Sequence, residues 1–245
     1  MSAMLRMLTT ALAAVAIAAL VLPAPVQSQS DTLRIGIIGT GNIGGALARH
    51  WAAAGHELVI SSRNPDELEP LAEELGPRVR TGTPREAAAF GDVVLVSVPY
   101  AAMPQIGRDF AAELAGKIVL DTGNPIEGRD GDIVAESLQK GSGIASAELL
   151  PGTRLVRAFN CIPAQALANQ ANREPARIAI PLAGDDEEAL RVAQRLVDEA
   201  GFDGVVVGDL ETARYFDLGQ PLALGDASAD ELREAIADVI GNDRL

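Results

Sequence analysis

Short apolar runs recur along the chain after residue 31, and segments with helical spacing separate them. One such segment runs from Ile43 to Ala54, with apolar residues at every third or fourth position, and Gly55 ends it. This alternation predicts an α/β fold, a doubly wound parallel sheet of the NAD(P)-binding Rossmann type. Pro181 predicts that its strand lies at an edge of the sheet. The predicted strands span 34–38, 58–60, 78–81, 93–96, 117–120, 154–158, 177–182 and 205–207, and further helices span 66–75 and 186–200.

The first thirty residues have a different pattern. Arg6 precedes an unbroken apolar run over 12–22, which Pro23 ends and small or branched residues follow. A charged start, a short apolar run and a small-residue exit are typical of a secretory signal peptide, predicted here over 1–28. We therefore expect a single domain over 31–245, no stable membrane span after cleavage, and a periplasmic or secreted location. A misassigned start codon would leave the protein cytoplasmic instead.

Composition excludes several classes of protein. The chain has 34 acidic and 20 basic residues, a formal charge of −14, and only 3% aromatic residues. A nucleic-acid-binding protein needs a basic face and usually aromatic platforms, so no nucleic-acid partner is expected. One cysteine allows no internal disulfide, and with only two histidines the sequence predicts no metal site.

A glycine-rich turn follows the first strand and opens the first helix, in the order Gly39, Thr40, Gly41, Asn42, Ile43, Gly44. In a G-x-G-x-x-G motif the first glycine permits the tight turn and the second lets a pyrophosphate approach the backbone. The third lets the helix pack against the sheet. The helix N-terminus offers free amides to the phosphates. This context favours a dinucleotide site over a purely structural glycine turn.

The end of the second strand indicates which dinucleotide binds. NAD sites place an acidic residue there for the ribose 2′-hydroxyl, whereas this chain has Ser61, Ser62 and Arg63. Hydroxyls and a guanidinium bind a 2′-phosphate, which an acid would repel. The sequence therefore predicts NADP(H), the alternative for Arg63 being a solvated surface arginine.

No side chain is predicted to act as a general acid or base. His50, His56 and Lys117 fall at the amino end of the predicted sheet, and Lys140 lies in a polar turn. The residues left at the carboxyl edge are Ser97, Pro99, Tyr100, Asp121, Asn124, Pro125, Asn160 and Cys161. Such groups hold a flat cofactor well and move protons poorly, which favours hydride transfer between two redox cofactors.

Three of these residues have two interpretations each. Cys161 is a redox thiol or a small apolar filler, and the filler is favoured because no second cysteine exists. Tyr100 stacks on nicotinamide or covers the core. Asp121 orients a loop through its carboxylate or caps backbone amides.

Three motifs in order resemble the NADP oxidoreductases that depend on the deazaflavin coenzyme F-420. The motifs are residues 35–44, 62–65 and 157–164, and the resemblance covers 33–218. The NADPH-binding domain of the six-transmembrane metalloreductases is similar in fold and in its Ser-Arg-Asn-Pro run. The resemblance implies NADP contacts at Thr40, Gly41, Asn42, Ile43, Ser62 and Arg63. It also implies a nicotinamide side lined by Val98, Pro99, Asn124, Ala158 and Asn160.

The resemblance implies an NADPH-dependent oxidoreductase that transfers a hydride between nicotinamide and a deazaflavin or flavin, with a small-molecule redox acceptor as its partner. The alternative is a non-catalytic NADP-binding or redox-sensing domain. A homodimer is also left open, because a neighbouring subunit often helps to bind a second-site flavin.

The chain departs from the family in three respects. Asp66 and Glu67 stand where members often have a basic residue, Cys161 stands where threonine is usual, and the predicted signal peptide contrasts with a family that is typically cytoplasmic.

Overall fold

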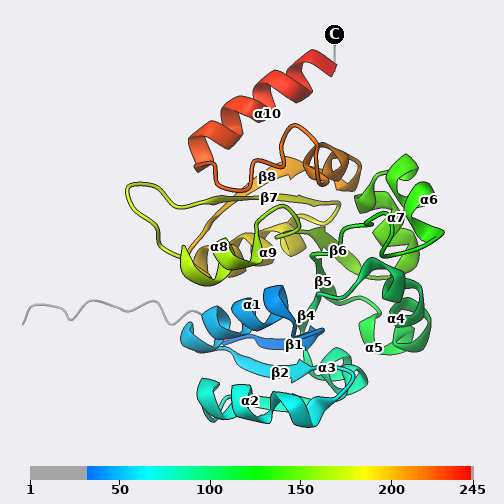
Figure 1. Ribbon diagram of the computed structural model, residues 1–245, viewed down its shortest axis with the longest axis vertical. Helices are drawn as coiled ribbons and strands as arrows, with labels where there is room; N and C mark the ends of the chain where they lie inside the picture. The colour runs from blue at the N-terminus through cyan, green and yellow to red at the C-terminus, as the bar shows by residue number, and fades with distance from the viewer. Residues whose placement is uncertain (1–31, 244–245) are drawn as a thin grey trace, which may run out of the picture. The chain divides into compact units, whose positions relative to one another are not determined.

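The computed structural model of the protein describes residues 32–243, in which the strands form one eight-stranded sheet (Figure 1). The strand order is β3-β2-β1-β4-β5-β6-β7-β8, and every pair is parallel except β6–β7. The doubly wound fold class is thus confirmed. The strands are β1 (Arg34–Ile38), β2 (Glu57–Ser61), β3 (Val79–Gly82), β4 (Val93–Val96), β5 (Ile118–Asp121), β6 (Arg154–Arg157), β7 (Ala179–Gly184) and β8 (Asp203–Gly208).

Helices cover both faces of the sheet. The α-helices are α1 (Asn42–Ala53), α2 (Glu69–Leu75), α3 (Pro84–Phe90), α4 (Met103–Asp109), α5 (Ala111–Leu114), α6 (Ile133–Lys140), α7 (Ser142–Leu149), α8 (Ala164–Asn169), α9 (Glu187–Glu199) and α10 (Ala229–Asp243). The 3-10 helices are η1 (Pro65–Leu68), η2 (Tyr100–Ala102) and η3 (Leu210–Phe216).

Three apolar clusters bury the sheet. The cluster on one face joins α1, α2, α8 and α9 to the strands, around the fully buried Trp51. The cluster on the other face joins α3, α4 and α5 to the strands. A third cluster packs η3 and α10 against β7 and β8, and Figure 1 shows α10 in red beside β8.

The expectations for β7 are partly wrong. The strand lies between β6 and β8 rather than at an edge, and it runs antiparallel to β6. Pro181 is tolerated there because only Ala183 and Gly184 pair with β6, which leaves the proline outside that ladder. The predicted helix over 66–75 is also two elements, η1 and α2, and Pro70 stands in the first turn of the second.

The strand order reverses between β1 and β4. From β1 the chain builds outward through β2 and β3, then returns over α3 to place β4 on the other side of β1. The return is close: a Cβ on Gly36 would lie 2.0 Å from the carbonyl oxygen of Ala87 in α3. Ligands of open α/β sheets bind outside the carboxyl ends of the strands at such a switch point.

The predicted signal peptide over 1–28 lies outside the described residues. Among residues 32–243, no helix combines the length and the apolar character needed to cross a membrane.

Candidate functional site

A cavity of about 730 Å³ opens at the switch point, beyond the carboxyl ends of β1, β2 and β4. Seven of the predicted site residues line it: Gly39, Thr40, Gly41, Ser62, Arg63, Val98 and Pro99. The remaining lining residues are Ile38, Pro84, Ser97, Ala101, Ala102, Gln105, Ile106, Asp109 and Phe110. Predictions from separate stretches of sequence therefore meet in one hollow.

The three glycines of the turn have different surroundings. Gly39 has φ +94°, and a Cβ there would lie 2.2 Å from the carbonyl oxygen of Ser97. A Cβ on Gly44 would lie 2.2 Å from the carbonyl oxygen of Gly39. Gly41 has an ordinary φ of −85°, and its Cβ would meet no atom within 4 Å. Neither a positive φ nor packing within the described chain requires glycine at position 41, and the space beside it is open.

The amino end of α1 faces the same turn with its amides free. Gly41 is the N-cap and supplies no side chain, and the first turn carries no acidic residue. Gly45 is the first residue to donate back, to the Gly41 carbonyl at 2.8 Å. The amides of Asn42, Ile43 and Gly44 precede it and have no acceptor within the helix. Such an end attracts anions. Asn42, Ile43 and Gly44, which were also predicted to belong to the site, are not among the residues that line the cavity.

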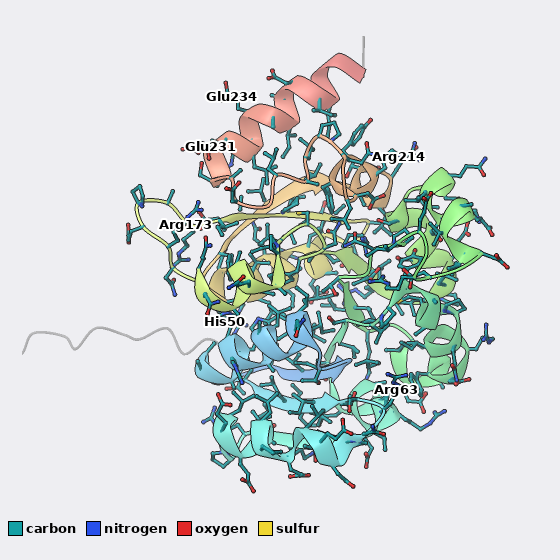
Figure 2. All side chains as sticks on the ribbon, viewed as in Figure 1. His50, Arg63, Arg173, Arg214, Glu231 and Glu234 are labelled. Carbon is teal, nitrogen blue, oxygen red and sulfur yellow. The ribbon has the colours of Figure 1, made fainter. Side chains whose placement is uncertain are left out.

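Arg63 is the cation of the cavity. Its side chain is exposed at the end of β2, and it makes no hydrogen bond or ion pair with another residue of the described range. Figure 2 shows Arg63 on the side of α3 and α4, whereas His50 on α1 lies at the other end of the strands. The hydroxyl of Ser62 donates to the Asn64 carbonyl at 2.8 Å and accepts from the Asn64 amide at 3.1 Å. That hydroxyl must therefore rotate before it can donate to a ligand.

Asn124 and Asn160 form a second group of predicted residues, after β5 and β6. Asn124 Nδ2 donates to the Asn160 carbonyl at 2.7 Å, and Asn160 Nδ2 donates to the Phe216 carbonyl at 2.9 Å. Phe159 holds a positive φ of 59°, a strained backbone for a bulky residue, directly before Asn160. The Oδ1 of Asn160 is buried and has no hydrogen-bond partner in the described structure. None of Asn124, Ala158 and Asn160 lines the cavity.

A buried ion pair lies next to this second group, at the ends of β5 and β6. Arg157 and Asp121 are both fully buried and are joined by a bond of 2.5 Å from Nη1 to Oδ2. Arg157 Nη2 also donates to the Gly123 carbonyl at 2.7 Å. Burial opposes the charge on Arg157, but the carboxylates of Asp121 and Asp217 outweigh it, so the pKa of the guanidinium is raised. The pair ties the ends of β5 and β6 together beside Asn124.

The structure decides between the alternative interpretations of three residues. Cys161 is a buried filler, and burial raises the pKa of its thiol to about 12. Tyr100 is fully buried, outside the cavity lining, with its hydroxyl 3.0 Å from Ser146 Oγ. Burial raises the pKa of this phenol. Asp121 accepts from the Gly123 amide at 2.7 Å, so it caps a backbone amide in addition to pairing with Arg157.

The histidines and lysines lie away from the cavity, as predicted. His50 Nε2 bonds the Leu167 carbonyl at 2.8 Å, and His56 bonds the Leu33 amide and Glu199. Lys117 Nζ donates to two carbonyls at the end of α3. Lys140 pairs with Glu136 and Glu148. No metal-binding cluster of histidine, cysteine or acidic residues occurs in the described part of the chain.

One wall of the cavity, built by α3 and α4, is not predicted from the sequence. Pro84 stands in the first turn of α3, and Gln105, Ile106 and Asp109 stand on α4. Phe110 follows, with the Arg85 guanidinium 5.2 Å from its ring centre. The run 103–110 mixes apolar and polar residues without a strong helical stripe, so only its position after a central strand signalled a role.

Comparisons with known proteins identify a family and several relatives. A family model described as NADP oxidoreductase, coenzyme F420-dependent, matches residues 34–125, which hold β1 to β5 and the cavity lining. The F420-dependent NADP reductase of Methanothermobacter thermautotrophicus is 31% identical over 217 residues, covering 83% of this chain and 93% of the relative. The metalloreductase STEAP3 of Rattus norvegicus is 31% identical over 186 residues, which is 74% of this chain and only 35% of that protein.

Solved structures show the same fold. A hypothetical protein of Sinorhizobium meliloti matches with a TM-score of 0.69 at 30% identity, covering 83% of this chain and 98% of that chain. A protein of Arthrobacter sp. FB24 matches with a TM-score of 0.63 at 24% identity, covering 74% and 87%. The identity with the Methanothermobacter reductase over nearly its full length confirms the resemblance, and the chain belongs to the family of coenzyme F420-dependent NADP oxidoreductases, as an NADP-dependent oxidoreductase.

Proposed function

We propose that this protein transfers a hydride between the nicotinamide of NADP(H) and a deazaflavin, coenzyme F420, with a flavin as the next candidate. The observation that carries the proposal is the cavity itself. It brings an unpaired arginine and a ligand-accessible glycine turn together, and of its lining residues only Arg63 and Asp109 are charged.

The residues present fit NADP(H). The pyrophosphate fits the turn at Gly41, where no side chain intervenes and the amides of Asn42 and Ile43 are free. The 2′-phosphate fits Arg63, which has no competing acid at the end of β2. Asp66 and Glu67 are exposed in η1 after Pro65, and Glu67 Oε1 accepts from Asn64 Nδ2 at 3.0 Å. That bond holds the Glu67 carboxylate against Asn64.

The nicotinamide side is assigned to Val98, Pro99, Asn124, Ala158 and Asn160. The buried, unpartnered Oδ1 of Asn160 supports this assignment, because a buried acceptor without a donor is costly unless a ligand supplies one. A nicotinamide carboxamide carries a suitable N–H donor.

Hydride transfer suits this lining better than proton transfer does. The lining offers no histidine, lysine or cysteine, and its carboxylate, Asp109, is exposed at the end of α4, so we assign no catalytic side chain. Bound NADPH supplies the hydride, and the chain's residues orient it and exclude water. The acceptor is proposed from relatives: proteins of two Methanothermobacter species and of Methanocaldococcus jannaschii are named F420-dependent NADP reductases.

We further propose that the protein is exported by the signal at 1–28 and that it forms a homodimer completing the acceptor side. N-terminal sequencing of the exported protein should begin near Gln29. A start at Met1 in the cytosolic fraction would contradict export.

The function is tested by NADPH oxidation with coenzyme F420, FMN, FAD and ferric chelates in parallel, while NADPH binding is followed by fluorescence. Turnover with F420 supports the proposal. Turnover with FMN or FAD alone would show that the acceptor is a flavin instead of F420. Turnover with ferric chelate alone would align the chain with the metalloreductase. Binding without turnover on any acceptor would favour the redox-sensing alternative.

A further inference from the structure

The loop that connects β5 to α6 is closed by one buried carboxylate. The side chain of Asp130 is fully buried and accepts from two backbone amides, Ile126 at 2.9 Å and Ala101 at 3.2 Å. Ile126 belongs to Asp130's own loop, whereas Ala101 lies in η2, the next element after β4. The carboxylate therefore joins the segments that follow two neighbouring strands.

Arg129 holds the other side of the same carboxylate. Its Nε lies 3.1 and 3.0 Å from the two oxygens of Asp130, and its Nη2 lies 2.7 Å from Oδ2. The same Nη2 donates to the Asn124 carbonyl at 2.7 Å. The side chain of Arg129 is 44% exposed, so it bridges the loop surface to the buried acid.

The segments joined in this way are the ones that flank the candidate site. Pro99, Ala101 and Ala102 line the cavity, and Asn124 begins the second group of site residues. The amide bond to Ala101 fixes the first segment against the loop, and the Arg129 bond fixes the carbonyl of Asn124. A shift in either contact would change the spacing between the cavity wall after β4 and the second group of site residues at Asn124.

We propose that Asp130 and Arg129 are positioning residues that set this spacing for hydride transfer, an assignment that rests on the proposed function. They touch neither the cavity nor a reacting atom and act through Ala101 and Asn124. Misplacement of reacting groups by about 1 Å can cost up to about 100-fold in rate, so a small displacement of a wall is sufficient.

Electrostatics favour a permanently charged pair. Burial alone would raise the pKa of Asp130, but its bonds from Arg129, Ile126 and Ala101 outweigh burial and lower that pKa. The carboxylate thus stays ionised, and both its oxygens remain acceptors.

The test compares Asp130→Asn, Arg129→Met and Arg129→Lys in the full chain. Single-turnover oxidation of NADPH by coenzyme F420 gives the transfer rate, fluorescence gives the NADPH dissociation constant, and hydrogen exchange of the ligand-free protein reports the amides of Ala101 and Ile126. The control pair is Asp230→Asn and Arg233→Met, an exposed ion pair on α10 joined at 2.9 Å.

We expect Asp130→Asn and Arg129→Met to slow transfer by about 10- to 100-fold while the NADPH dissociation constant changes less than about threefold. Arg129→Lys restores part of the rate because it keeps a cation. Exchange at Ala101 or Ile126 accelerates at least about tenfold in Asp130→Asn, since an amide replaces one acceptor oxygen by donors.

Two outcomes overturn the inference: unchanged transfer rates in both Asp130→Asn and Arg129→Met, or equal losses in the α10 control pair. Failure of the proposed function is distinguishable, because the unmodified protein would then not bind NADPH or not reduce the acceptor. The exchange measurement still tests the contacts in that case. Unchanged exchange at Ala101 and Ile126 in Asp130→Asn would contradict the role of Asp130 in joining the two segments.

Discussion

The carbonyl oxygen of Gly39 lies only 2.2 Å from the position that a Cβ on Gly44 would occupy. Two residues of one turn thus fix how closely α1 approaches the end of β1. Gly41, between them, has open space in place of such a neighbour. Within this six-residue motif, packing therefore requires glycine at position 44, whereas at position 41 the space is left open for a ligand.

Gly44→Ala and Gly41→Ala should consequently fail in different ways. Gly44→Ala forces backbone atoms apart and should destabilise the fold by about 1–3 kcal/mol. Gly41→Ala keeps the fold within about 0.5 kcal/mol but should weaken NADPH binding at least about tenfold, because the methyl group occupies the phosphate's approach. Urea unfolding and fluorescence titration check the two effects. Unaltered NADPH affinity in Gly41→Ala would contradict the placement of the pyrophosphate.

Arg63→Ala should discriminate between the two dinucleotides. The lost charged hydrogen bond corresponds to about 1.5–3 kcal/mol for NADPH, whereas NADH lacks the 2′-phosphate and should change by about twofold or less. Titration with both nucleotides measures the difference, and Arg191→Ala on the exposed surface of α9 is the matched control. Equal losses for NADPH and NADH would remove the assigned role of Arg63.

Cys161 should make stability depend on alkaline pH. Burial raises its pKa to about 12, against about 8.5 for an ordinary thiol, so the unfolded chain loses this proton first. The stabilisation is complete below about pH 8.5 and declines as pH rises toward about 12, by up to about 1.4 kcal/mol per pH unit. Urea unfolding between about pH 8 and 10.5 should show a steeper decline in the natural protein than in Cys161→Ala, in which the buried phenol of Tyr100 still titrates. Parallel curves for the two proteins would contradict the buried, inert thiol.

Two arginines of β6 should differ sharply in their contribution to stability. Arg157→Met leaves the buried carboxylate of Asp121 without its cation and should cost about 3–5 kcal/mol of unfolding free energy. Arg154→Met breaks a partly exposed pair with Asp186 and should cost about 1 kcal/mol or less. Comparable urea midpoints for the two variants would contradict the role of the buried pair in joining β5 to β6.

Local patterns account for what could be predicted from the sequence. The strands up to β6 and the glycine turn could be predicted because each depends on residues close together in the sequence. Because these strands are parallel, their carboxyl ends bring Gly41, Arg63 and Pro99 to one edge of the sheet. Strand direction at β7 was missed because an alternating pattern contains no information on it. Two contacts could not be predicted because they join residues 29 or more positions apart: Asn160 with the Phe216 carbonyl, and Asp130 with the Ala101 amide. The α4 wall could not be predicted because its sequence lacks a periodic signal.

Direct hydride transfer from NADPH to the deazaflavin can be followed with deuterium. NADPH carrying deuterium at both positions of nicotinamide C4 is mixed with oxidised coenzyme F420 and the protein in ordinary water, and the reduced deazaflavin is analysed by mass spectrometry. Direct transfer predicts that one deuterium moves to a carbon atom of the deazaflavin, with none exchanged into water. NADPH binding without deuterium in the acceptor would contradict the account and leave a nucleotide-binding domain without the proposed activity.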